Sequence, residues 1–201
     1  MKSFTSKTLL KLISVSLLTL SLSGCAGIFI AGAATTANIV TDTRNTKEIW
    51  NDNNIEFEVA AITNKQPYRG SVRVTASSYR GSVVLMGQAT TDAERRSFES
   101  QAKDVPGVDT IHNQIRVKEP LSVSAISKDS WITTKVKSAL LANSELNGIK
   151  VKVITEDSEV FLLGLVSREH ADIATEVARN ISGVKQVIRA FEYGEEETAV
   201  N

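Results

Sequence analysis

Residues that could perform chemistry are scarce in this chain of 201 residues. It contains one cysteine, Cys25, and two histidines, His112 and His170. Neither histidine has a second histidine or a cysteine at the spacing of a metal site. No glycine-rich phosphate loop and no nucleophile paired with a base can be identified. We therefore expect no catalytic residues, no metal and no cofactor, and we expect that the protein is not an enzyme.

The composition narrows the class of protein further. Hydrophobic residues make up 42% and charged residues 23%, which is typical of a globular chain rather than a disordered one. Lys and Arg number 23, as do Asp and Glu. A chain without net charge is not a general polyanion binder, so we expect no nucleic-acid partner. The acidic residues 195–197 lie in a tail, 194–201, that we expect to be solvated.

The first 24 residues have the pattern of a signal peptide. Three lysines precede or interrupt an apolar run over residues 9–22, and this run is too short to span a bilayer. The sequence Leu22-Ser23-Gly24-Cys25 that follows resembles the lipobox of bacterial lipoproteins. This resemblance implies cleavage before Cys25, a diacylglyceryl group on its sulfur and acylation of the new amino terminus. Several acyl chains together form a stable membrane anchor.

The residue after the cysteine indicates the destination. Ala26 stands where an aspartate would favour retention at the inner membrane, so the lipoprotein resemblance implies the periplasmic face of the outer membrane. Residues 25–49 are a mixture of small, apolar and polar types without a clear period, and we interpret them as a lipidated tether. The mature chain has 20 basic and 23 acidic residues, a formal charge of −3.

An internal repeat organises the rest of the chain. A shift of 77 residues places Val72, Val74 and Ala76 on Ile149, Val151 and Val153, and residues 82–87 on 159–164. The repeat defines two units, 50–118 and 128–193, joined by a linker over 119–127. Each unit is close to the lower size limit for a core of its own, so we expect the two to pack on each other.

Hydrophobic periodicity predicts the elements of the second unit. We expect a helix over 129–142 capped by Asp129 or Ser130, strands over 149–153, 160–166 and 184–193, a turn over 156–158, and a helix from 167 to about 181. The continuous apolar run 160–166 suits a strand buried on both faces. Crossover connections are right-handed, so the third strand should run parallel to the second, with both helices on one face.

This order of elements, with a glycine in the middle strand and another after the second helix, resembles the BON domain. The resemblance covers both units and is strengthened by the lipobox. It implies an α+β fold of two tandem BON domains, each with the order αββαβ and a small mixed three-stranded sheet packed against two helices.

The first helices of the two units differ on the side away from the core. Trp131 replaces Asn54, and a helical wheel separates a core stripe from a second face. The stripe holds Ile132, Val136, Ala139 and Leu140, and the second face holds Trp131, Thr134, Lys135, Ser138, Leu141 and Ala142. Tryptophan prefers the headgroup level of a bilayer, and Lys135, Lys137, Lys150 and Lys152 could attract anionic headgroups. The equivalent face of the first unit carries Glu56 and Glu58, so we expect only the second unit to touch lipid.

From the residues alone, two interpretations of Trp131 stay open, since it could contact lipid or pack between the units. The BON resemblance favours lipid, because it implies binding of an anionic phospholipid, phosphatidylglycerol or cardiolipin, by the first helix of the second domain. Carried over by position, the site comprises Trp131, Val136, Lys137, Ser138, Leu141 and Ala142. Val136 also lies on the core stripe.

The family resemblance also implies a biological role, namely support of envelope integrity and localisation to division sites. The alternative is a periplasmic adaptor, whose helix would bind an envelope protein partner such as an assembly component or a cell-wall enzyme.

Overall fold

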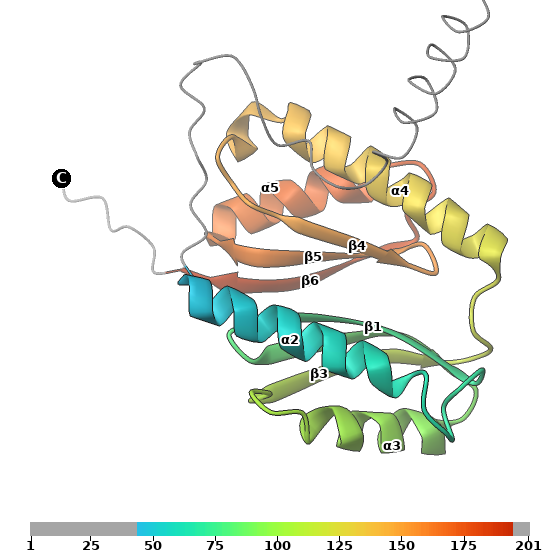
Figure 1. Ribbon diagram of the computed structural model, residues 1–201. Coiled ribbons are helices and arrows are strands. Elements are labelled where there is room, and N and C mark those ends of the chain that lie inside the picture. Colours follow the sequence, from blue (N-terminus) through green and yellow to red (C-terminus); the bar gives the residue numbers. More distant parts are fainter. Residues whose placement is uncertain (1–43, 195–201) are drawn as a thin grey trace, which may run out of the picture. The chain divides into compact units, whose positions relative to one another are not determined.

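The computed structural model describes residues 44–194, in which one order of elements occurs twice (Figure 1). The first repeat consists of α2 (Thr46–Ile62), β1 (Val72–Tyr79), β2 (Ser82–Ala89), α3 (Asp92–Lys103) and β3 (Thr110–Val117). The second consists of α4 (Val123–Ala142), the 3₁₀ turn η2 (Ser144–Leu146), β4 (Lys152–Glu156), β5 (Glu159–Val166), α5 (Arg168–Arg179) and β6 (Gln186–Tyr193). The predicted α+β class with two αββαβ units is confirmed.

Each repeat folds into a mixed three-stranded sheet covered by two helices on one face. The order is β1-β2-β3 in the first sheet and β4-β5-β6 in the second. The middle strand is antiparallel to the strand before it and parallel to the strand after it, which confirms the expected crossover. Figure 1 shows α4 and α5 over the second sheet. Their buried residues, including Ile132, Val136 and Ala174, form a core with Val160 and Leu162 of β5.

The other face of each sheet packs against the other repeat, as expected for units of this size. Val84 and Met86 of β2 form a cluster with Phe161 and Leu163 of β5. Alternate residues of β5 therefore enter different cores, because successive side chains of a strand point to opposite faces. This arrangement explains why the run 160–166 is apolar throughout, with neither face of the strand left to solvent.

Polar contacts at the edge of this sandwich also join the repeats. The carboxylate of Glu156 accepts hydrogen bonds from Arg73 and from Gln88, the latter at 2.8 Å. Burial raises the pKa of Glu156 above its usual range, although these two bonds oppose the effect. Arg116 pairs with Glu159 at 2.9 Å. A buried charge must be compensated, so the Glu156 carboxylate is stabilised by its partners from the first repeat, whereas the Arg116–Glu159 pair is partly exposed.

A carboxylate from the first helix of each repeat holds the turn of the hairpin beside it. Asp52 accepts hydrogen bonds from the backbone N–H groups of Arg80 and Gly81, and Asp129 does the same for Asp157 and Ser158. In both turns the two central residues have positive φ, the backbone of a tight type I′ hairpin. The repeated aspartate thus supports a strained turn rather than capping a helix.

Substituting Asp52 by Asn should weaken the fold at neutral pH and flatten its acid dependence. Burial alone would raise the pKa of Asp52, but hydrogen bonds from Ser78, two backbone N–H groups and Arg44 hold it below its ordinary value of 3.8. Because the pKa of Asp52 is lower in the folded state than in the unfolded state, the ionised carboxylate stabilises the fold at pH values above the unfolded-state pKa. This stabilisation is lost as the pH falls through the folded-state pKa.

We expect Asp52→Asn to lower the free energy of unfolding at pH 7 by about 1–3 kcal/mol, with a smaller difference below about pH 4. Urea unfolding at both pH values measures the effect, with exposed Asp104→Asn as the matched control. Equal losses for the two variants at pH 7 would show that the turn does not depend on this carboxylate.

Two elements differ from the sequence prediction by more than two residues. The first helix of the second repeat begins at Val123 with Ser122 as its N-cap, so Asp129 and Ser130 do not cap it, and much of the predicted linker is helical. Strand β4 starts at Lys152 rather than at residue 149, and it includes Glu156, which we had placed in the turn. The reason is the two-residue turn at Asp157 and Ser158, which lets pairing continue to Glu156↔Glu159.

Candidate functional site

The side of α4 that points away from its core carries large apolar groups in contact with solvent. Val123 is 80% exposed, Trp131 is 64% exposed and Leu141 is 82% exposed. At 100° per residue these three side chains fall within an arc of about 80°, opposite the buried Ile132 and Val136. We call this surface the outer face of α4. The interpretation in which Trp131 packs between the repeats does not fit its exposure.

The structure places the predicted residues of α4 in three environments. Thr134, Lys137, Ser138 and Ala142 are exposed, as are Trp131 and Leu141. Lys135 is partly buried, and its ammonium donates a hydrogen bond to the backbone carbonyl of Ser182. Val136 has no exposed area, because it lies at the centre of the helix–sheet core. Its side chain therefore cannot contact a ligand on the surface, and its inclusion in the site was wrong.

The polar side chains between the apolar groups are largely bonded to the helix itself. The hydroxyl of Ser127 donates to the carbonyl of Val123, that of Ser130 to Ile126, and that of Thr134 to Ser130, each at 3.0 Å. A hydroxyl satisfied in this way loses little when water leaves it. The outer face is thus less costly to dehydrate than its composition indicates.

The exposed charged side chains of α4 are all positive. The helix carries Lys128, Lys135 and Lys137, and its one carboxylate, Asp129, is buried and bonded to the hairpin turn. Among residues 44–194, Lys137 has no ion-pair or hydrogen-bond partner. The two lysines expected to help from the adjacent strand contribute less, because Lys152 pairs with Glu56 of the first repeat at 2.7 Å and Lys150 also has a partner.

A small apolar hollow adjoins the C-terminal end of the outer face. Its volume is about 180 Å³, and it is lined by Lys137, Leu140, Leu141, Leu146, Ile149 and Val151. Sequence reasoning missed this hollow, since it forms only when η2 and the segment before β4 fold beside α4. It also missed Val123, for which Ser122 as an N-cap residue was the available signal.

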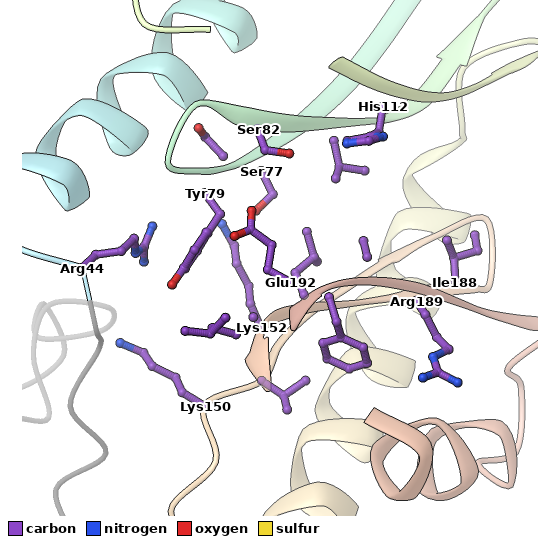
Figure 2. Close-up of a pocket in the computed structure, with 18 of the residues that line it drawn as sticks. Arg44, Ser77, Tyr79, Ser82, His112, Lys150, Lys152, Ile188, Arg189 and Glu192 are labelled. Atoms are coloured by element: carbon purple, nitrogen blue, oxygen red, sulfur yellow. The ribbon is translucent and has the colours of Figure 1, made fainter. Parts of the chain in front are cut away.

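A larger cavity of about 700 Å³ lies between the two repeats (Figure 2). Figure 2 shows Tyr79, Ser77 and Ser82 on one side, with Glu192, Lys152 and Arg189 on the other. Most of its cations are already paired: Arg44 with Asp52, Lys152 with Glu56, and Arg189 with Asp172. Burial raises the pKa of Glu192, a further carboxylate in the wall. Lys137 of α4 also lines this cavity, so the cavity and α4 share that charge. Lys128 adds a second exposed positive charge on α4 alone, whereas the cavity wall adds the carboxylates of Glu56 and Glu192.

The remaining candidates for chemistry occupy structural or undescribed positions. The ring Nδ1 of His170 lies 2.8 Å from the hydroxyl of Ser167, the N-cap of α5, and His112 lies on β3. Within the described residues, no three or more His, Cys, Asp or Glu side chains cluster as metal ligands, and no helix is long and apolar enough to cross a bilayer. Cys25 and residues 195–197 lie outside the described range.

Comparison with known proteins assigns both repeats to one family. The BON domain matches residues 51–119 and 128–195. The chain is 40% identical over 176 residues to the outer membrane lipoprotein DolP of Haemophilus influenzae, covering 87% of this chain and 91% of that protein. It is 44% identical over 153 residues to a 21 kDa hemolysin of Actinobacillus pleuropneumoniae, covering 76% and 79%. The osmotically-inducible protein Y of Escherichia coli is 32% identical over 108 residues, covering 52% and 54%.

Proposed function

The chain belongs to the BON-domain family and is an outer-membrane lipoprotein, and we propose that its second domain binds anionic phospholipid through the outer face of α4. The observation that carries the proposal is the exposure of Trp131 and Leu141 on a helix whose lysines have no competing surface carboxylate. Phosphatidylglycerol and cardiolipin are the anionic lipids that we propose as ligands.

Each part of this surface supplies a different share of the binding energy. The indole of Trp131 suits the headgroup level, where its ring can contact acyl carbon while its N–H donates a hydrogen bond to water or to a headgroup. Leu141 and the adjoining hollow can receive acyl carbon, which contributes about 0.8 kcal/mol per buried methylene. Each lysine near a charged surface adds about 1 kcal/mol, so Lys137 and Lys128 favour an anionic leaflet.

Acylation makes a contact of this modest strength sufficient. We propose Cys25 as the acylated residue, which would keep the domain at the membrane whether or not α4 is engaged. A tethered site works at a high effective concentration, so a weak second contact can still respond to lipid composition. We propose that this response underlies division-site localisation and support of envelope integrity.

The two tryptophans of the chain allow a direct test. In a Trp50→Phe variant, Trp131 is the sole tryptophan and reports only the environment of α4. For the mature chain with Cys25→Ser, we expect phosphatidylglycerol vesicles to shift the Trp131 emission to the blue. Phosphatidylcholine vesicles should have a much smaller effect, and added salt should weaken the response.

Substitution of Lys137 by Glu in this background should weaken binding about tenfold or more, since it replaces one attraction by one repulsion. The matched control is Lys103→Glu, an exposed lysine in the last turn of α3. An emission spectrum that does not respond to anionic vesicles would refute the lipid site. Reproducible capture of one envelope protein by the same face would instead favour the adaptor function.

A further inference from the structure

The first helix of the first domain, α2, also has a solvent-exposed aromatic face, at positions different from those on α4. Trp50 is 67% exposed and Phe57 is 71% exposed. They are seven residues apart, about two helical turns, and project from the side opposite the buried Ile55 and Val59. We call Trp50 and Phe57 the aromatic face of α2.

The charges expected to repel this helix from a membrane are mostly engaged elsewhere. Glu56 accepts hydrogen bonds from the backbone N–H of Ser78 and from the ammonium of Lys152. Glu48 caps the start of its own helix, and Asp52 is buried at the hairpin turn. The remaining charges of α2, Lys47 and Glu58, cancel. The aromatic face therefore lies on a surface that is close to neutral rather than acidic.

The position of α2 in the chain restricts what can cover this face. The helix begins at Thr46, 21 residues after Cys25, and a chain of that length can span up to about 70 Å. The leaflet that holds the acyl chains is thus within easy reach. Two aromatic side chains bury at most about 500 Å², less than the roughly 800 Å² per partner of a stable protein interface. A second copy of the chain is therefore a poor candidate for the partner.

We propose that the aromatic face of α2 docks on the lipid surface next to the anchor, and that it binds neutral, zwitterionic lipid without needing anionic headgroups. This proposal rests on the acyl anchor but not on the lipid site of α4. The two faces would then have different lipid preferences. The aromatic face of α2 would bind the first domain to a leaflet of any headgroup charge, and the outer face of α4 would bind anionic lipid.

The test uses the acylated mature chain with Trp131→Phe, in which Trp50 is the sole tryptophan, incorporated into phosphatidylcholine vesicles. We expect a blue-shifted Trp50 emission, loss of much of that emission when the lipids carry bromine on their acyl chains, and little change on adding salt. Substituting Phe57 by Glu should weaken docking of the face about tenfold and restore most of the emission. The matched control is Lys65→Glu, an exposed position beyond the end of the helix.

Three outcomes would overturn the proposal. Trp50 could stay accessible to a soluble quencher such as acrylamide and insensitive to brominated lipid. It could be protected without lipid and become accessible on dilution, which would indicate a second copy. It could also become accessible only when residues 26–43 are deleted, which would indicate that the tether covers it. None of these results changes the Trp131 experiment, so failure here is distinguishable from failure of the α4 site.

Discussion

Replacing Gly87 by alanine is expected to unfold the first domain, or to destabilise it by more than about 4 kcal/mol. Gly87 lies in β2, two residues before the end of the strand, and pairs with Val74 of β1. A Cβ atom on Gly87 would lie 2.0 Å from the carbonyl oxygen of Arg73, which is backbone and cannot rotate away. The φ of +144° at this position adds strain for any L side chain. The two strands would have to separate, and the core beneath them would lose its packing.

Urea unfolding followed by circular dichroism measures this effect. A loss of that size is a large part of the roughly 5–15 kcal/mol by which a typical domain is stable, so the unfolding midpoint should shift clearly. Gly164→Ala tests the equivalent position of the second domain, where the Cβ would lie 2.5 Å from the carbonyl oxygen of Lys150. Gly194→Ala is the control, since its nearest neighbour would be a Leu165 methyl at 3.9 Å. If Gly87→Ala and Gly194→Ala unfold at the same urea concentration, the close approach of β1 and β2 is not a feature of the folded protein.

The fold was largely predictable because the sequence contains it twice. The shift of 77 residues pairs Gly87 with Gly164 and Asp52 with Asp129, and the structure gives both members of each pair the same task. Local periodicity also indicated the strand order and its crossover, since these depend on neighbouring segments. The role of the two aspartates was not predictable, because each carboxylate bonds to a turn nearly 30 residues further along the chain.

The outer face of α4 was predictable for a similar reason, since a helical wheel needs no tertiary information. What the wheel could not show is which lysines remain unpaired. Lys152 pairs with Glu56, 96 residues away, across the contact between the domains. The burial of Val136 was visible in the apolar stripe, and there the stripe was a better guide than the positions carried over from the family.

The aromatic face of α2 was missed because the equivalent face of the first unit was judged by its carboxylates, Glu56 and Glu58. Under the repeat, Trp50 and Phe57 correspond to Ser127 and Thr134, which lie on the outer face of α4. Both first helices therefore present large apolar groups on the same side, at different turns. Weighing the aromatic residues of the α2 face together with its carboxylates would have identified both.

Combining Trp131→Glu with Leu141→Glu is expected to abolish recruitment of the unacylated chain to phosphatidylglycerol vesicles while leaving the fold intact. Each substitution removes an apolar side chain that would otherwise enter the leaflet and adds a charge that the anionic surface repels. Burying such a side chain fully contributes about 1.5–3 kcal/mol. Losing two side chains that each insert partly into the leaflet should therefore weaken binding at least about 100-fold. Because the two side chains are 64% and 82% exposed, the free energy of unfolding should change by no more than about 0.5 kcal/mol each.

Vesicle flotation measures the bound fraction, and urea unfolding of the same samples checks the fold. Val117→Glu is the matched control, because Val117 is another exposed apolar residue, 51% exposed, at the end of β3 and outside α4. Equal loss of binding in the control would mean that added negative charge anywhere on the protein is enough to repel the vesicle. Unchanged binding of the double variant would remove α4 as the lipid contact. If the variant loses only a protein partner, the adaptor function would explain why this helix keeps its indole in water.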